Sequence, residues 1–145
     1  GLVTARRARR VGDVAAPEAV AALSLLSRTR AERSTTIGAA FLALARQDST
    51  AAVAQMLRAA DELPDAAALL VAMAARVETA RGADARAIPL WTRVTEQYAR
   101  APEAAEARLE WGRALKRRGD LRGARTQFET LIIEHSGSAL VPQAR

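Results

Sequence analysis

An internal repeat with a period of 37 residues, the distance from Ala87 to Ala124, constrains this chain more than any other feature. A trio of apolar residues occurs twice, as Ala87, Trp91 and Val94 and again as Ala124, Phe128 and Leu131. Each trio follows a glycine, Gly82 or Gly119, by the same step. Periods in the thirties are typical of stacked helical hairpins, which form binding surfaces more often than active sites.

The composition favours an all-α fold. Hydrophobic residues make up 50% of the chain but aromatic residues only 3%, so the core must be built by close approach of small side chains. Alanine dominates, and alanine is the best helix former. The sequence contains no run of 18 or more apolar residues, so we expect no transmembrane helix. It has no cysteine, which excludes a disulfide or a thiolate metal site.

The net charge of +6 does not by itself indicate nucleic-acid binding. Lys116 is the one lysine among 22 basic residues, a bias that we attribute to codon usage in a GC-rich genome. Residues 1–12 form a basic arm with four arginines between Arg6 and Arg10, and no aromatic residue lies among them to stack on bases. We therefore expect a solvated arm, and consider nucleic acid an unlikely partner.

Apolar spacing predicts seven helices after this arm. The first is an N-terminal helix over residues 13–32. The next three are expected from Ser34 to Asp48, between Ser49 and Pro64, and from Pro64 to Gly82. The last three are expected from Asp84 to Tyr98, from Pro102 to Gly119, and from Leu121 to His135. Pro89 lies inside the fifth helix, which we expect to begin late or to bend there.

The residues of the last hairpin resemble the tetratricopeptide repeat. The similar residues are Trp111-Gly112, Leu115, Gly119-Asp120-Leu121, Ala124 and Phe128, and Pro64 falls at the closing proline of the first repeat. The resemblance implies a right-handed superhelical solenoid of about three hairpins over residues 33–138, with repeats at about 33–66, 68–101 and 105–138. Residues 139–145 would begin a truncated further repeat.

The junction between hairpins is similar to that of the bacterial cell-envelope members of this family. Residues 97–104 and 134–141 occupy equivalent places and form a three-residue extension between hairpins. This similarity favours the bacterial cell envelope or periplasm over the cytoplasm, and leaves the compartment open.

The sequence offers little material for catalysis. His135 is the only histidine, so the chain cannot build a histidine-based metal site or a histidine-paired nucleophile cluster. Glu103 and Glu106 lie in a first helical turn, where the helix dipole explains acidic residues. We expect no catalytic, cofactor-binding or metal-binding residue, and we expect Trp91 to belong to the core.

The resemblance instead implies a concave groove lined by the first helix of each hairpin. The candidate partner-binding residues are Ile37, Phe41, Leu44, Leu69, Arg76, Leu109, Arg113, Lys116 and Arg117. This groove would be apolar at one end and basic at the other, which suits a peptide or helix with acidic groups. Alternatively, the N-terminal helix covers Phe41 and Leu44, and Lys116 and Arg117 form a solvated helix end.

A second candidate surface is the uncapped C-terminal end, where Leu131, Ile132 and Ile133 would leave an apolar face for a partner or for self-association. The function expected from these features is a non-catalytic protein interaction scaffold. The alternatives are a structural subunit of a larger assembly or filament, and a helical accessory domain of a larger enzyme or envelope protein.

Overall fold

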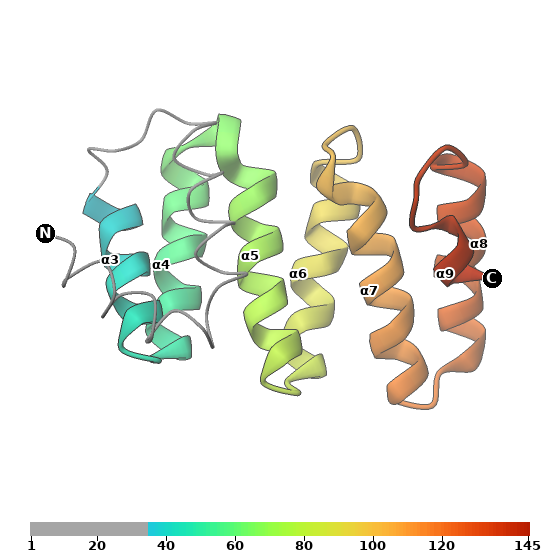
Figure 1. The fold of residues 1–145 in the computed structure, drawn as a ribbon, viewed down its shortest axis with the longest axis horizontal. Coiled ribbons are helices and arrows are strands. Elements are labelled where there is room, and N and C mark those ends of the chain that lie inside the picture. The colour runs from blue at the N-terminus through green and yellow to red at the C-terminus, as the bar shows by residue number, and fades with distance from the viewer. Residues whose placement is uncertain (1–34) are drawn as a thin grey trace, which may run out of the picture. The chain divides into compact units, whose positions relative to one another are not determined.

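A computed structural model describes residues 35–145 of the chain. These residues form helices and no strand, so the predicted all-α class is confirmed (Figure 1). The elements are α3 (Thr35–Ala45), α4 (Ser49–Glu62), the 3-10 helix η1 (Pro64–Ala66), α5 (Ala67–Ala80), α6 (Asp84–Gln97), α7 (Glu103–Arg117), α8 (Leu121–Glu134) and α9 (Val141–Ala144). The basic arm at 1–12 and the helix expected at 13–32 lie outside the described residues.

The chain divides into two compact units, residues 1–73 and residues 74–145. In the first unit, α3 and α4 pack against each other as a hairpin. Asp48 caps α4, because its side chain accepts a hydrogen bond of 3.1 Å from the backbone N–H of Ala51. The hydroxyl of Thr36 donates to the Glu62 carboxylate at 2.8 Å, and this bond links the start of α3 to the end of α4. Met56 on α4 is buried, as its place in the repeat predicts.

In the second unit, α6 packs against α7, and α7 packs against α8. The turns before α6 and α8 are built alike. Gly82 and Gly119 have φ values of +74° and +85°, which only glycine adopts without strain. After each glycine a backbone N–H bonds back to the preceding helix, from Ala83 to Glu78 and from Asp120 to Leu115, both at 2.9 Å. The helices that precede these turns, α5 and α7, therefore end in the glycine cap that the sequence predicts.

The repeated trio forms the core of this second unit. Trp91 has no exposed surface, and the other two residues of its trio, Ala87 and Val94, are equally buried. Gly112 of α7 lies directly against the ring of Phe128 in α8. A Cβ atom at Gly112 would come within 2.7 Å of the Cδ1 atom of that ring. The small residue therefore lets the two helices of the hairpin touch, and the prediction that Trp91 is a core residue is confirmed.

Of the two effects expected of Pro89, a late start of α6 or a bend, the late start does not occur. The helix α6 begins at Asp84 and contains Pro89 in its interior, so it does not begin late. The missing N–H of Pro89 deprives the carbonyl of Ala85 of its helical partner. Ala85 is exposed, which allows water to hydrate that carbonyl. Pro89 is therefore tolerated inside α6, and the helix still begins at Asp84.

Candidate interaction surface

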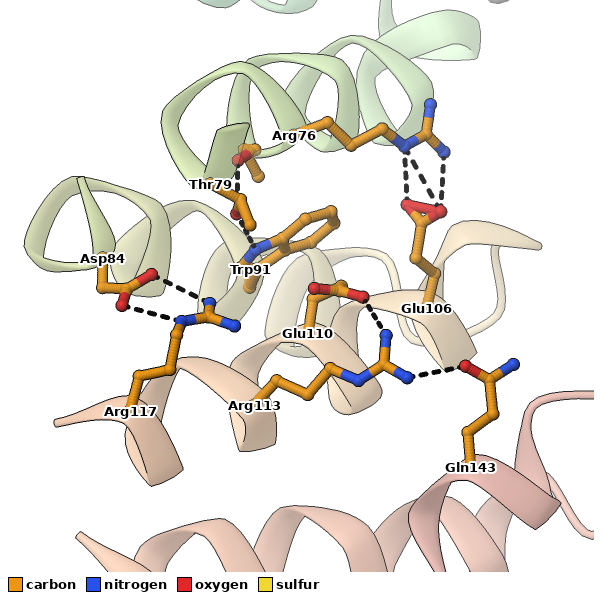
Figure 2. A network of polar contacts seen from close by, with 10 residues as sticks. Arg76, Thr79, Asp84, Trp91, Glu106, Glu110, Arg113, Arg117 and Gln143 are labelled. Carbon is orange, nitrogen blue, oxygen red and sulfur yellow. Dashed lines mark hydrogen bonds and ion pairs between the residues drawn. The ribbon is translucent and has the colours of Figure 1, made fainter. Parts of the chain in front are cut away.

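Four charged residues follow one face of α7 at steps of four, three and four residues: Glu106, Glu110, Arg113 and Arg117. This spacing places them in a stripe along the helix. Arg76 of α5 and Asp84 at the start of α6 pair with members of the stripe (Figure 2). We call these six residues the charged row. All of them belong to the unit of residues 74–145, so the row can be described as one surface.

Arg76 and Glu106 form the first step of the row. The Nε of Arg76 donates to one carboxylate oxygen of Glu106 at 2.8 Å, and its Nη2 donates to the other at 3.0 Å. This bidentate geometry is the strongest arrangement of a guanidinium and a carboxylate. Both side chains remain about a third exposed, so the pair adds at most about 1 kcal/mol to stability.

Arg117 and Asp84 form a second bidentate pair, with two bonds of 2.9 Å. The hydrogen bonds from the Arg117 guanidinium hold the pKa of Asp84 below its ordinary value of 3.8. The same pairing raises the pKa of Arg117. Asp84 therefore stays ionised and fixes the direction in which the Arg117 side chain lies.

Arg113 lies between these pairs and has two acceptors. Its Nη1 donates to Glu110, one turn earlier on α7, at 2.8 Å. Its Nη2 donates to the side-chain oxygen of Gln143 on α9 at 2.6 Å (Figure 2). Arg113 is thus held by one carboxylate and one neutral amide, and 40% of its side chain is exposed.

The structure places the four basic groove candidates together on α5 and α7, but three of them are paired. Arg76, Arg113 and Arg117 each contact a carboxylate. Lys116 is exposed and forms no ion pair with another described residue. The C-terminal half of α7 nevertheless retains an excess of positive charge, because Arg118 also lies exposed beside these residues.

The apolar groove candidates are mostly interior. Ile37 and Leu69 are buried, and Leu109 is 1% exposed. Leu109 packs against Leu131 and Ala144, so residues of its own unit cover it. Leu44 is half-buried, and the side chain of Phe41 lies outside the described set.

The C-terminal face is covered by α9. Leu131 is fully buried in the cluster with Leu109 and Ala144, and Ile132 and Leu140 pack around this cluster. Ile133 alone of the three predicted end residues is exposed, at 78%. Residues 141–144 therefore supply a first helical turn that covers the end of the last hairpin.

Four of the interacting residues are not among the site residues predicted from the sequence: Asp84, Glu106, Glu110 and Gln143. Glu110 could have been found, because it precedes Arg113 by three residues on a predicted helix. Gln143 could have been found from the repeat, because it lies 37 residues after Glu106. Asp84 offered no comparable signal, since its contact depends on the path of the turn at Gly82.

Among the described residues, no group of three or more His, Cys, Asp or Glu side chains could hold a metal ion. No helix within residues 35–145 is long and apolar enough to cross a membrane. His135 ends α8, where its backbone N–H donates to Leu131 at 2.9 Å.

The sequence matches no protein-family model and no curated protein. The resemblance to the tetratricopeptide repeat therefore rests on the residues of this chain alone.

Proposed function

We propose that this chain is a non-catalytic protein interaction scaffold of the tetratricopeptide type, which binds an acidic segment of a partner protein along the charged row. The observation that carries the proposal is the fixed presentation of three partly exposed guanidinium groups, those of Arg76, Arg113 and Arg117. Side chains that are held in place before binding lose less entropy when a partner arrives.

The tetratricopeptide type is supported by how the hairpins pack. The family's small residue at Gly112 makes the close contact with Phe128 that such hairpins need. The two glycine-led turns are built in the same way, and Asp120 caps α8 by accepting a bond of 2.8 Å from Gly123. The handedness and the solenoid arrangement of the hairpins are part of this proposal.

The preference for acidic partners follows from the charge balance around the C-terminal half of α7. Arg113, Lys116, Arg117 and Arg118 carry four positive charges there, against the two negative charges of Glu110 and Asp84. Lys116 lies one turn after Arg113 on the helix, so both can contact one bound segment. A segment with carboxylates spaced along it would complement this excess.

The test is a binding titration with a short fluorescein-labelled peptide in which Glu-Leu pairs alternate with serine, called the acidic peptide below. Fluorescence anisotropy should show saturable binding that weakens as salt rises. Replacing Arg113, Lys116 and Arg117 together by glutamine should weaken binding by at least about tenfold, because charged hydrogen bonds are lost. Glutamine is preferable to glutamate, which would lie against Glu110 and Asp84 and repel them.

The controls separate charge recognition from other effects. A matched variant, with Arg122 and Arg125 on the exposed side of α8 replaced by glutamine, also loses positive charge, and should bind like the original chain. A neutral peptide with Gln for each Glu should not bind. Equal affinity of the triple variant and the original chain would overturn the proposal.

A structural subunit is the second candidate, favoured by the exposure of Ile133 on α8. Light scattering over a range of concentrations distinguishes the two functions. Growth in mass that disappears on Ile133→Ser would favour assembly through α8. A constant monomer mass would favour the scaffold.

A further inference from the structure

Two contacts made by arginines of the charged row repeat with the period of the sequence. Arg76 donates to Glu106, and Arg113, 37 residues after Arg76, donates to Gln143, 37 residues after Glu106. The separation between donor and acceptor is 30 residues in both cases. Arg76 and Arg113 therefore occupy equivalent positions in successive hairpins. Each donates a hydrogen bond to a side chain 30 residues later in the chain.

The two contacts differ in the chemistry of the acceptor. Glu106 offers two charged oxygens and takes both the Nε and the Nη2 of Arg76. Gln143 offers one neutral oxygen to the Nη2 of Arg113, at 2.6 Å. A carboxylate accepts two parallel charge-assisted hydrogen bonds from one guanidinium and also neutralises its charge, whereas the Gln143 amide accepts a single bond and carries no charge. The position at Arg113 thus holds a weaker acceptor than its repeat partner does.

The surroundings of Arg113 allow this acceptor to be exchanged. Gln143 is exposed and lies on α9, a helix of four residues. The apolar neighbours Leu140 and Ala144 hold α9 against the Leu131 cluster, so the side chain of Gln143 can leave without undocking the helix. Lys116 stands nearby on α7 with no carboxylate of its own among the described residues.

We propose that Gln143 occupies the place where a carboxylate of the acidic partner binds, and that the partner displaces the Gln143 amide from the Nη2 of Arg113. This inference rests on the proposed function, and names the residue that the partner's acid engages and the internal group that competes for it. The bound carboxylate would reproduce at Arg113 the acceptor that Glu106 supplies to Arg76. No covalent change is involved, only the exchange of one acceptor for another.

The experiment compares Gln143→Glu and Gln143→Ala in the same titration with the acidic peptide. Glutamate at 143 supplies an internal carboxylate to Arg113, so Gln143→Glu should weaken binding by about fivefold. Alanine removes the competitor, so Gln143→Ala should strengthen binding by about twofold. A third variant, Glu106→Gln, gives Arg76 a neutral amide as acceptor, as Gln143 is for Arg113. It should raise the affinity for the peptide or the number of peptides bound per chain.

Folding is checked first by the helical circular dichroism signal and the melting temperature of each variant, and the exposure of residue 143 makes large losses unexpected. Failure of the original chain to bind the peptide would overturn the proposed function. Binding that is unchanged by both Gln143 variants would leave that function standing and overturn this inference alone. Weaker binding of Gln143→Ala would also overturn it, because Gln143 would then assist the partner.

Discussion

Arg113 is joined to Gln143 by the same 30-residue step that joins Arg76 to Glu106. A side-chain contact that recurs with the sequence period indicates that successive hairpins keep one packing register across this surface. The register also explains why α9, although only four residues long, takes a defined place beside α7 and α8. These two contacts therefore recur with the same 37-residue spacing as the core residues.

The contact between Gly112 and Phe128 can be tested by adding one methyl group at position 112, where it would overlap the ring. We expect Gly112→Ala to lower the free energy of unfolding by about 1–2 kcal/mol, because overlap with the ring outweighs the better helix propensity of alanine. Gly38 in α3 is the matched control, since a Cβ atom there meets nothing within 4 Å. Gly38→Ala should raise stability by about 0.5–1 kcal/mol in urea unfolding. A Gly112→Ala variant as stable as the original chain would contradict the close contact.

The hydroxyl of Thr79 satisfies the buried indole of Trp91. The Nε1 of Trp91 donates to Thr79 at 3.1 Å, and Trp91 has no access to water. Thr79→Val keeps the shape but leaves this donor unpaired, so we expect a loss of about 1–3 kcal/mol in the free energy of unfolding. Thr92→Val serves as control, because its hydroxyl donates only to the backbone of Ile88. Equal effects of the two substitutions would argue against the Trp91 bond.

The Asp84 and Arg117 pair predicts a specific dependence on pH. Because pairing with Arg117 holds the folded pKa of Asp84 below 3.8, the pair adds stability above that pH, and this stability is lost as pH falls through the folded pKa. Arg117→Gln should raise the pKa of Asp84 in an NMR titration of its side chain. Arg118→Gln should raise it less, because Arg118 acts only through its charge. An unchanged Asp84 titration in Arg117→Gln would refute the pairing.

Glu78 marks a position where stability can be gained. It is 2% exposed, one of its oxygens accepts from Arg81 at 3.1 Å, and the other has no hydrogen-bond partner among the described residues. Its repeat partner, 37 residues later, is Leu115. We expect Glu78→Leu to raise the free energy of unfolding by about 1 kcal/mol, because it removes the desolvation cost of a buried carboxylate while Arg81, whose side chain is 35% exposed, stays in contact with water. A lower urea midpoint in the variant would show that the carboxylate contributes to folding.

Most helix boundaries could be predicted because each has a local chemical cause. Gly82 and Gly119 end helices by adopting positive φ, and Pro64 separates α4 from α5. The burial of Trp91 could be predicted because its repeat partners are also large and apolar. Pro89 was harder, because the effect of a proline depends on whether water reaches the carbonyl that it leaves unpaired.

The charge pairing of the surface could not be predicted residue by residue. Counting charges along the groove positions indicated a basic end, but Arg76 and Arg117 find carboxylates 30 and 33 residues away. Such pairs depend on how hairpins are placed and on side-chain rotamers, which the apolar periodicity does not encode. The burial of Leu109 was missed for a related reason, because it depends on residues of α9 that follow the last hairpin.

The most direct test of the central claim is an NMR titration of the 15N-labelled chain with the acidic peptide, following the backbone amides and the arginine Nε–H signals. Saturable shifts are expected at Arg113, along the C-terminal half of α7, and at the side-chain amide of Gln143. The shifts at Arg113 and Gln143 should rise together as the peptide is added. Binding that shifts only the exposed residues of α8, or that leaves Arg113 and Gln143 unchanged, would contradict the central claim.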